Sequence, residues 1–362
     1  MEGNARLIVA NNMIMEAETA HVLQTGQMLA AFARVVPEVS YYWPDFGRRV
    51  AWLDTLAVTR RPIPCHFRHG ARRYAEFVWR LGSQLREHPP ELLFTRNLGV
   101  ALAAQRVARR VFLELHQGLS SQARRVAPWL GPRVWIVAIS EGLRRHLIER
   151  DGFVPERVRV CHDGVDVERF ITARPFLPLN QRFLPDRGCR LHHLYYGTMR
   201  PERGLDLIRE AARQLPDQGF VLVGGTLAEV AKVQAAGLDL PNIRILPAIA
   251  HCEIPRLIRS FDTVLLPYTR AVTTHAWMSP LKLFEVMASG IPAVISRLPS
   301  ILEVVDDSQV AFIDSDHPES LIATLRGIAA DPEAARTRAQ AAQALAMARY
   351  SWEHRARDIL DL

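Results

Sequence analysis

The sequence predicts an α/β protein built from two doubly wound parallel sheets, each with helices on both faces. Three observations lead to this fold class. The chain has 362 residues, which suits about two domains of about 150 residues each. Short apolar segments of strand length alternate with segments whose apolar residues recur at helical spacing. A proline-containing stretch without periodicity, residues 172–190, interrupts this alternation, which then starts again.

The expected elements of the first half alternate regularly. Apolar strand segments cover residues 7–10, 91–95, 111–115, 135–139 and 158–161. Helical periodicity covers 17–35, 100–109 and 141–149, and Ser140 is a favourable N-cap for the last of these helices.

The second half repeats the pattern. Strands are expected at 192–196, 220–224, 243–246, 263–266 and 293–295, with helices at 204–215, 227–236, 253–260 and 280–288. Residues 329–362 read as two further helices. In open parallel sheets, ligands bind beyond the carboxyl ends of the strands. Two such domains are therefore expected to offer their loops to a cleft.

The composition excludes several classes of protein. Apolar residues make up 49% and charged residues 23%, so the chain is neither disordered nor fibrous. No apolar run approaches the roughly 18–20 residues of a membrane span, and the first residues lack the basic leader of a signal peptide. The four cysteines are scattered without metal-like spacing, which favours reduced thiols and a cytoplasmic protein.

Positive charge is concentrated in the first half. Residues 1–175 hold 25 basic and 17 acidic residues, against 20 and 21 in the remainder. Such an excess favours an anionic partner, namely nucleic acid, an anionic membrane surface or a phosphorylated substrate. No nucleic-acid-binding motif accompanies the charge, so we expect no nucleic acid as partner.

One segment, residues 60–86, combines many arginines with aromatic residues. Two interpretations remain open for it. It is either an amphipathic surface for anionic lipid, which would make the protein peripheral at the inner membrane, or a solvated basic helix packed through its aromatic side chains. The residues concerned are Arg60, Arg61, Arg68, Arg72, Arg73, Arg80 and Arg86, with Phe67, Tyr74, Phe77, Trp79 and Leu81 between them.

The sharpest motif is the start of the expected helix 280–288. Ser279 is a good N-cap, and Pro280 suits the first helical position because its missing N–H would have no partner there. The amides of Leu281 and Lys282 would then point out of the helix start, where phosphate groups bind. Glu285 lies one turn further and could accept hydrogen bonds from a vicinal diol such as a ribose. Alternatively, Lys282 and Glu285 form a solvated helix pair.

This segment, Ser279 to Pro292, resembles the second half of the signature of the family-four retaining glycosyltransferases of the GT-B fold. The resemblance extends over nearly the whole chain, in the order of that family. Its other segments are Glu114-Leu115-His116, Ala138 to Leu143, Val158 to Phe170, Gly197 to Gly204, Phe261 to Pro267 and the closing Tyr350-Ser351-Trp352.

The resemblance implies a domain organisation and an activity. Residues 1–172 would form a Rossmann-like acceptor-side domain, 173–190 a linker, 191–345 a Rossmann-like nucleotide-sugar-binding domain and 346–362 a helix that crosses back to the first domain. The implied reaction is transfer of a sugar, expected to be a hexosyl group, from a UDP- or GDP-linked donor with retained anomeric configuration. The acceptor would be a glycan or glycolipid in polysaccharide or cell-envelope biosynthesis.

The resemblance also assigns roles to single residues. His116 would stand near the leaving-group bond as the catalytic residue, and Glu285 would hold the donor ribose. The remaining donor-binding residues would be Gly197, Thr198, Arg200, Arg203, Ile249, Ser279, Leu281 and Lys282, with Arg203 and Lys282 on the diphosphate. Basic side chains and helix amides would stabilise the leaving diphosphate, so no cofactor and no metal ion is expected.

The sequence departs from the family pattern at three places. Trp277 stands where the family has its first signature Glu, and Thr273, Thr274 or His275 would have to contact the donor sugar instead. Thr198 stands where the family has its phosphate-loop Arg, which Arg200 would replace. Residues 11–19 replace the usual Gly-Gly loop. These changes leave open a catalytically inactive GT-B protein that binds a nucleotide or a partner enzyme, or a different GT-B enzyme such as a sugar-nucleotide epimerase. Arg96, at the end of a strand, is a cleft candidate without an assigned role.

Overall fold

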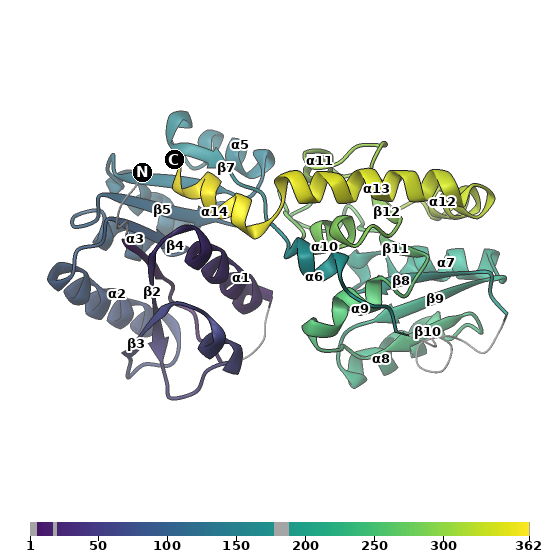
Figure 1. Ribbon diagram of the computed structural model, residues 1–362, viewed down its shortest axis with the longest axis horizontal. Helices are drawn as coiled ribbons and strands as arrows, with labels where there is room; N and C mark the ends of the chain where they lie inside the picture. Colours follow the sequence, from purple (N-terminus) through teal and green to yellow (C-terminus); the bar gives the residue numbers. More distant parts are fainter. Residues whose placement is uncertain (1–5, 17–19, 177–187, 362) are drawn as a thin grey trace. The chain divides into compact units, whose positions relative to one another are not determined.

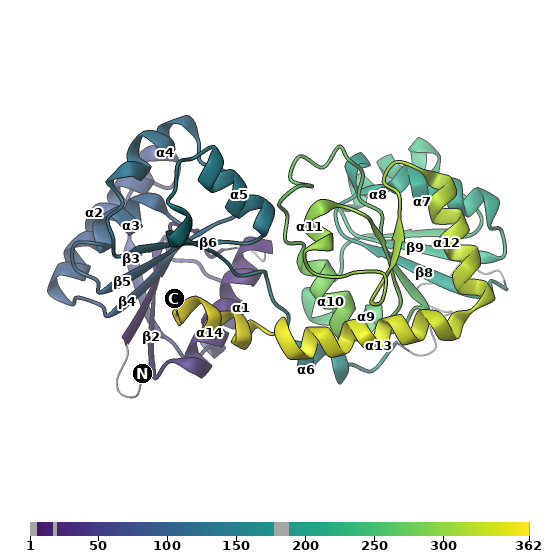
Figure 2. The same ribbon diagram turned by 90° about the horizontal axis from the view of Figure 1, so that it is seen from above.

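A computed structural model describes residues 6–16, 20–176 and 188–361 of the chain. The chain forms two compact units, Met1–His162 with Trp352–Leu362 and Asp163–Ser351. Residues 177–187 of the expected linker and residues 17–19 of the first expected helix lie outside the described residues. Each unit is an α/β layer structure in which helices cover both faces of a parallel sheet (Figure 1, Figure 2). The predicted fold class is confirmed.

The first unit contains a seven-stranded sheet in the order β3-β2-β1-β4-β5-β6-β7. All its strand pairs are parallel. The strands are β1 (Arg6–Ala10), β2 (Glu38–Asp45), β3 (Thr59–Pro64), β4 (Leu92–Thr95), β5 (Arg110–Leu115), β6 (Val134–Ala138) and β7 (Val158–Val160). The helices are α1 (Ala20–Val35), α2 (Gly70–Glu87), α3 (Leu98–Ala104), α4 (Ser121–Val126), α5 (Glu141–Glu149) and α14 (Trp352–Leu360).

Two strands of this sheet, β2 and β3, were not among the expected elements. Strand β2 ends with Pro44 and Asp45, which are unfavourable in strands, and β3 contains two prolines and two arginines. Strand β3 lies at the sheet edge, where proline is tolerated and one face is open to water. Helix α3 ends at Ala104, earlier than expected, whereas α5 has the expected bounds and the Ser140 side chain caps it by accepting from the Leu143 amide.

The second unit contains a six-stranded parallel sheet in the order β10-β9-β8-β11-β12-β13. The strands are β8 (Leu191–Tyr196), β9 (Gln218–Val223), β10 (Ile243–Leu246), β11 (Thr263–Leu266), β12 (Ala293–Ser296) and β13 (Ala311–Ile313). The helices are α6 (Val167–Ile171), α7 (Leu205–Gln214), α8 (Leu227–Val233), α9 (Ile254–Ile258), α10 (Leu281–Ser289), α11 (Pro299–Leu302), α12 (Pro318–Ala330) and α13 (Pro332–Arg349). Strand β13 and helices α11 and α12 were not expected.

The second sheet is apolar on both faces because helices cover both. Successive residues of a strand point to opposite faces, so Leu194 and Tyr196 of β8 pack in one core and Tyr195 between them in the other. Helices α9, α10 and α13 supply the first core, and α7 and α12 the second. Burial on both faces explains the continuous apolar strands of this half.

Three further expectations concern the whole chain. Among the described residues, no disulfide bond joins Cys65, Cys161, Cys189 or Cys252. Within the described part of the chain, no helix combines the length and the apolar character that a membrane crossing needs. The expected helix at the end of the chain is α14, which belongs to the first unit and packs against α1 there.

Candidate functional site

Polar side chains gather at the carboxyl edge of each sheet, near the point where the strand order reverses. In the first sheet this point lies between β1 and β4, and in the second between β8 and β11. Loops that leave such neighbouring strands run in opposite directions, which opens a crevice where ligands bind in doubly wound sheets. The structure therefore has one candidate site in each unit.

In the second unit, Lys282 lies against the end of β8. Its Nζ donates a 2.8 Å hydrogen bond to the backbone carbonyl of Tyr196, the last residue of that strand. The rings of Tyr195, Tyr196 and Tyr268 lie 5.2–5.7 Å from Nζ. Burial and the nearby charge of Arg203 lower the pKa of Lys282 to about 7, although Glu285 acts in the opposite direction. Nearby negative charge thus compensates the positive charge of the ammonium group only in part, and a bound anion would stabilise it.

Glu285 is 7% exposed and points to the same strand end. Its Oε2 accepts a 2.7 Å hydrogen bond from the Tyr196 hydroxyl, and its Oε1 lies 3.1 Å from His251 Nε2. Burial, together with the adjacent carboxylate, raises the pKa of Tyr196 well above its usual value, so the phenol remains a donor. A carboxylate has about four acceptor positions. Glu285 therefore retains capacity for further donors such as the two hydroxyls of a diol.

The phosphate-loop residues surround Lys282 only in part. Gly197 approaches so closely that a side chain there would collide with Nζ, and its φ of +134° also favours glycine. The Arg203 guanidinium lies 5.4 Å from the centre of the Tyr268 ring, and its buried Nε has no partner among the described residues. Thr198 and Arg200 are exposed, whereas Ile249 is half-buried and packs against the core.

The prediction that Ser279 caps the start of helix α10 is wrong. The helix begins at Leu281 with Pro280 as its N-cap residue, and Pro280 provides no side-chain cap. The Ser279 hydroxyl instead accepts a 3.0 Å hydrogen bond from the backbone amide of Asp163, which lies directly before α6. A long-range backbone donor outcompetes the local amides for this hydroxyl. The first amides of the helix remain without an intrahelical partner.

None of the three candidate residues near Trp277 supplies a carboxylate in place of the family's first signature Glu. The His275 ring uses Nδ1 to contact the carbonyl of Val272 at 2.8 Å, within its own loop. Thr273 is exposed and Thr274 is half-buried. Among the residues that the structure describes, no three His, Cys, Asp or Glu side chains are grouped as metal ligands.

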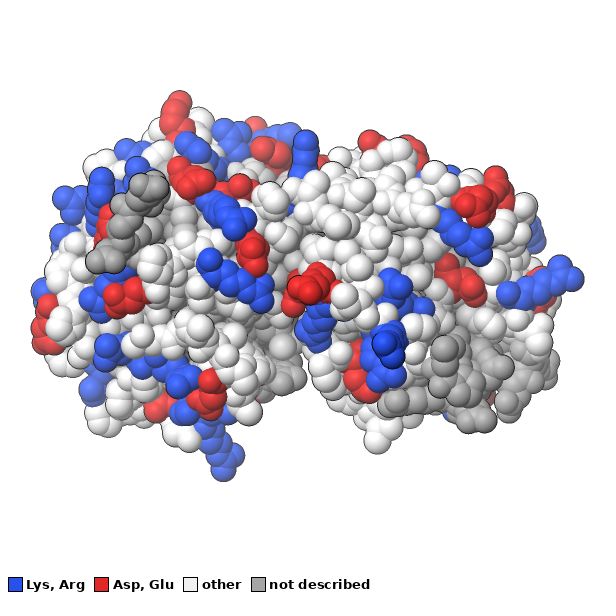
Figure 3. Space-filling view, in the orientation of Figure 1, with Lys and Arg blue, Asp and Glu red and all other residues white. Residues whose placement is uncertain are grey.

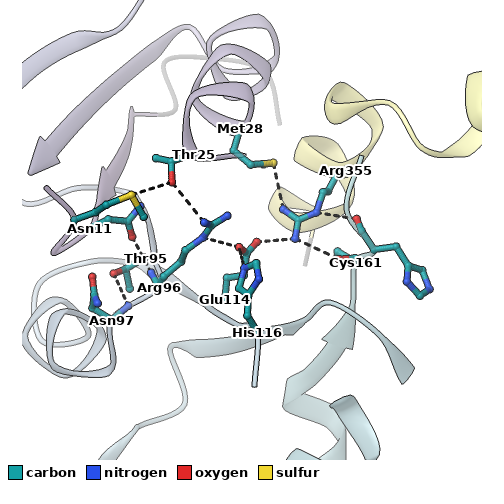
Figure 4. A network of polar contacts seen from close by, with 12 residues as sticks. Asn11, Thr25, Met28, Thr95, Arg96, Asn97, Glu114, His116, Cys161 and Arg355 are labelled. Carbon is teal, nitrogen blue, oxygen red and sulfur yellow. Dashed lines mark hydrogen bonds and ion pairs between the residues drawn. The ribbon is translucent and has the colours of Figure 1, made fainter. Parts of the chain in front are cut away.

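In the first unit, a buried carboxylate organises the strand ends (Figure 4). Glu114 of β5 is 1% exposed and forms ion pairs with Arg96 at 2.7 Å and with Arg355 at 2.6 Å. Burial by itself would raise the pKa of Glu114, but the two guanidinium groups and the hydrogen bond with His116 hold it well below the usual range. Glu114 is therefore ionised at neutral pH.

His116 contacts the same carboxylate. Its Nε2 lies 2.6 Å from Glu114 Oε1, and an ionised carboxylate can only accept, so Nε2 carries the proton. No described residue hydrogen-bonds to Nδ1, and the side chain is 23% exposed. In the neutral ring, Nδ1 is then an acceptor available to a hydroxyl group.

Arg355 connects this cluster with the last helix of the chain. Helix α14 carries Arg355, whose Nε donates to the carbonyl of His162 at 2.8 Å and whose Nη2 donates to that of Cys161 at 3.3 Å. Both carbonyls follow β7, at the end of the first unit's main segment. The guanidinium thus joins the final helix, β7 and Glu114 of β5.

Sequence analysis assigned no individual role to several residues of these two clusters. Glu114 carries a detectable signal, because a carboxylate inside the apolar strand VFLEL needs a partner when buried. Tyr196, the last residue of an expected strand, was named only as part of that strand. Neither His251 nor Arg355 has a local signal, because only the tertiary fold brings them to Glu285 and Glu114.

Two family models match the chain. One described as Glycosyltransferase Family 4 matches residues 24–169, and one described as Glycosyl transferase-like matches residues 201–361. Together the two matches cover most of the chain, and each falls largely within one of the two units.

Curated relatives and solved structures carry related descriptions. TuaH of Bacillus subtilis, a putative teichuronic acid biosynthesis glycosyltransferase, is 31% identical over 170 residues, 46% of this chain and 41% of that protein. A D-inositol 3-phosphate glycosyltransferase of Nocardioides sp. is 27% identical over 250 residues, 63% of this chain and 52% of that protein. The chain thus spans about half the length of these relatives.

The solved structures agree in fold over nearly the full length. A glycosyltransferase from Rickettsia africae superimposes with a TM-score of 0.77 at 13% identity, covering 99% of this chain and 98% of the other. HepE of Anabaena, crystallised with UDP and glucose, gives a TM-score of 0.75 at 18% identity with the same coverage. At these identities the likeness establishes the fold.

Proposed function

Since this chain belongs to the family-four glycosyltransferases with the GT-B fold, we propose that it transfers a sugar from a nucleoside-diphosphate sugar to a glycan or glycolipid acceptor. The donor is UDP- or GDP-linked, the sugar is a hexosyl group, and the anomeric configuration is retained. The observation that carries the proposal is the cluster at the end of β8, where Lys282 and Arg203 supply positive charge beside the buried carboxylate of Glu285.

The proposed donor contacts follow from the chemistry of these groups. Lys282, Arg203 and the first amides of α10 bind the diphosphate, because each offers a donor or a positive charge without an anionic partner. Glu285 accepts from the ribose hydroxyls through its remaining acceptor positions. Gly197 allows the backbone to approach the phosphates, and Thr198, Arg200 and Ile249 line the donor at the strand ends.

The proposed mechanism needs no protein nucleophile and no metal ion. Positive charge from Lys282 and Arg203 stabilises the diphosphate as the bond to the sugar breaks. The departing phosphate oxygen takes the proton of the acceptor hydroxyl, which attacks on the same face of the sugar. His116 is held in place by Glu114 and acts at the reacting centre, where its Nδ1 accepts a hydrogen bond from a sugar hydroxyl.

The name of one relative supports an acceptor in glycan assembly, and the name of another contains a phosphorylated inositol. TuaH is described by teichuronic acid biosynthesis and the Nocardioides protein by D-inositol 3-phosphate.

The basic surface of the first unit, defined as residues 60–86, supports peripheral contact with an anionic membrane. Figure 3 shows basic side chains, all of them arginine in this unit, spread over its face with acidic side chains between them. Trp79 is 68% exposed and Phe67 45% exposed in this segment.

The test is thermal unfolding with UDP, GDP, ADP and their common sugar conjugates. A ligand at 100 times its Kd stabilises by about 2.7 kcal/mol and raises Tm by roughly 5–10 °C. We expect a shift with one nucleotide class in the wild type and no shift in Glu285→Ala, whose fold stays intact. An unchanged shift in Glu285→Ala refutes the ribose role. A nucleotide shift without turnover of any sugar conjugate favours the inactive binding protein, and conversion of donor without acceptor favours the epimerase.

A further inference from the structure

Two buried donors at the carboxyl edge of the first sheet lack an acceptor among the residues that the structure describes. Asn11 follows β1, and Arg96 follows β4, the neighbouring strand (Figure 4). Asn11 is 1% exposed, and the Arg96 side chain is 10% exposed. Within the described part of the chain, neither Asn11 Nδ2 nor Arg96 Nη2 has a hydrogen-bond acceptor. A buried donor without an acceptor is destabilising, so these two nitrogens require an explanation.

The orientation of the Asn11 amide is determined by its neighbour. Asn11 Oδ1 accepts a 2.9 Å hydrogen bond from the backbone N–H of Arg96, which identifies this atom as the oxygen and leaves Nδ2 as a donor. The bond also holds the two residues side by side. The unpaired donors therefore belong to one small region of the strand edge.

The charge of Arg96 is compensated only in part. Its Nε donates to Glu114 at 2.7 Å and its Nη1 to Thr25 Oγ1 at 3.5 Å. The Glu114 carboxylate is shared with Arg355 and His116, which also contact its oxygens. Arg96 thus combines a free Nη2, a neighbouring free amide and a carboxylate that serves several donors. This combination attracts an acceptor with negative charge more strongly than a neutral one.

We propose that Asn11 and Arg96 bind an oxyanion of the acceptor, a phosphate or a carboxylate group. The proposal rests on the proposed function, since it describes the molecule to which the sugar is transferred. Asn11 Nδ2 and Arg96 Nη2 each donate to one oxygen of the anion, and the guanidinium supplies the opposing charge. Both nitrogens have almost no exposed surface, so the space around them suits only a small group. Small anions are therefore the suitable probes.

The experiment measures Tm against inorganic phosphate and against acetate, at ionic strength matched with chloride. UDP or GDP, whichever raises the wild-type Tm in the nucleotide test above, is present at saturation throughout, so that the nucleotide site of the second unit is occupied. We expect one of the two anions to raise the wild-type Tm by about 5–10 °C at 100 times its Kd. Phosphate alone would identify a phosphorylated acceptor, and acetate alone a carboxylate-bearing one.

The matched variants are Asn11→Asp and Asn97→Asp, which make the same chemical change in neighbouring loops. Asn11→Asp keeps the oxygen that accepts from Arg96 but replaces the free donor by an oxygen that pairs with the guanidinium, so anion affinity falls tenfold or more. Asn97 Oδ1 accepts from the Asn12 amide at 2.6 Å, and Asn97→Asp keeps most of the anion shift. If Asn11→Asp does not fold, Arg96→Lys, which lacks Nη2, is expected to lose the anion shift instead.

The outcomes separate this proposal from the proposed function. An anion effect no larger than that of chloride in the wild type overturns the oxyanion site and leaves a buried water molecule as the partner of both donors. Equal anion shifts in Asn11→Asp and Asn97→Asp overturn it as well. The absence of a Tm shift with both UDP and GDP, by contrast, counts against the nucleotide site in the second unit.

Discussion

Replacing Glu114 by Gln tests the cluster that organises the first unit. The amide has the shape of the carboxylate, so no cavity forms and the change removes mainly charge. Arg96 and Arg355 then remain buried without the carboxylate that they share. Removing one partner of a buried ion pair typically destabilises by about 3–5 kcal/mol. For a unit of this size, about 2–4 °C per kcal/mol gives a fall in Tm of roughly 6–20 °C.

A matched control lies on an exposed pair nearby. Arg34 of α1 and Glu353 of α14 form a 3.0 Å ion pair, with side chains 60% and 35% exposed. Because exposed pairs contribute about 0–1 kcal/mol, Glu353→Gln is expected to lower Tm by less than about 4 °C. Thermal unfolding of both variants decides the comparison. Equal losses in Glu114→Gln and Glu353→Gln would refute the central role of the buried cluster.

The pH dependence gives an independent readout of the same change. The pKa of Glu114 is lower in the folded protein than its unfolded value of about 4.3, so its contribution is complete above that value. This contribution is lost as the pH falls toward the folded pKa. The stability difference between the wild type and Glu114→Gln is therefore constant above about pH 5 and shrinks below about pH 4. A difference that stays constant down to pH 3 would contradict the assigned ionisation.

Two further predictions concern ligands. Burial and the charge of Arg203 lower the pKa of Lys282 to about 7, so its ammonium is lost as the pH rises through that value. Affinity for the nucleotide sugar should fall several-fold between pH 6 and pH 8 in the wild type and stay constant in Lys282→Met; the same pH profile in both proteins would exclude the phosphate contact. Arg72→Glu combined with Arg73→Glu should abolish binding to anionic vesicles at low salt, measured by co-sedimentation. Equal binding of the wild type to neutral and anionic vesicles would contradict the membrane proposal.

Local patterns in the sequence determined much of the fold. Alternation of strand and helix segments located most elements of both units, because periodicity and turn residues act over a few neighbouring positions. The same local chemistry singled out the start of α10 as a candidate site, whereas His116 and the loop after β8 were assigned roles through the family resemblance. It failed for the edge strand β3, whose prolines are acceptable only because of its position in the sheet.

The partners of the site residues were decided by the tertiary structure alone. Glu114 and Arg355 are 241 residues apart, and Tyr196 and Glu285 are 89 residues apart. The family resemblance implies that the last helix returns to the first unit, but nothing in the residues next to Arg355 indicates that its guanidinium pairs with Glu114. The Ser279 hydroxyl accepts from the Asp163 amide rather than forming the local cap that its position suggests. Burial makes such long-range pairs decisive, because a charged or polar group removed from water must find its partner wherever the fold brings one.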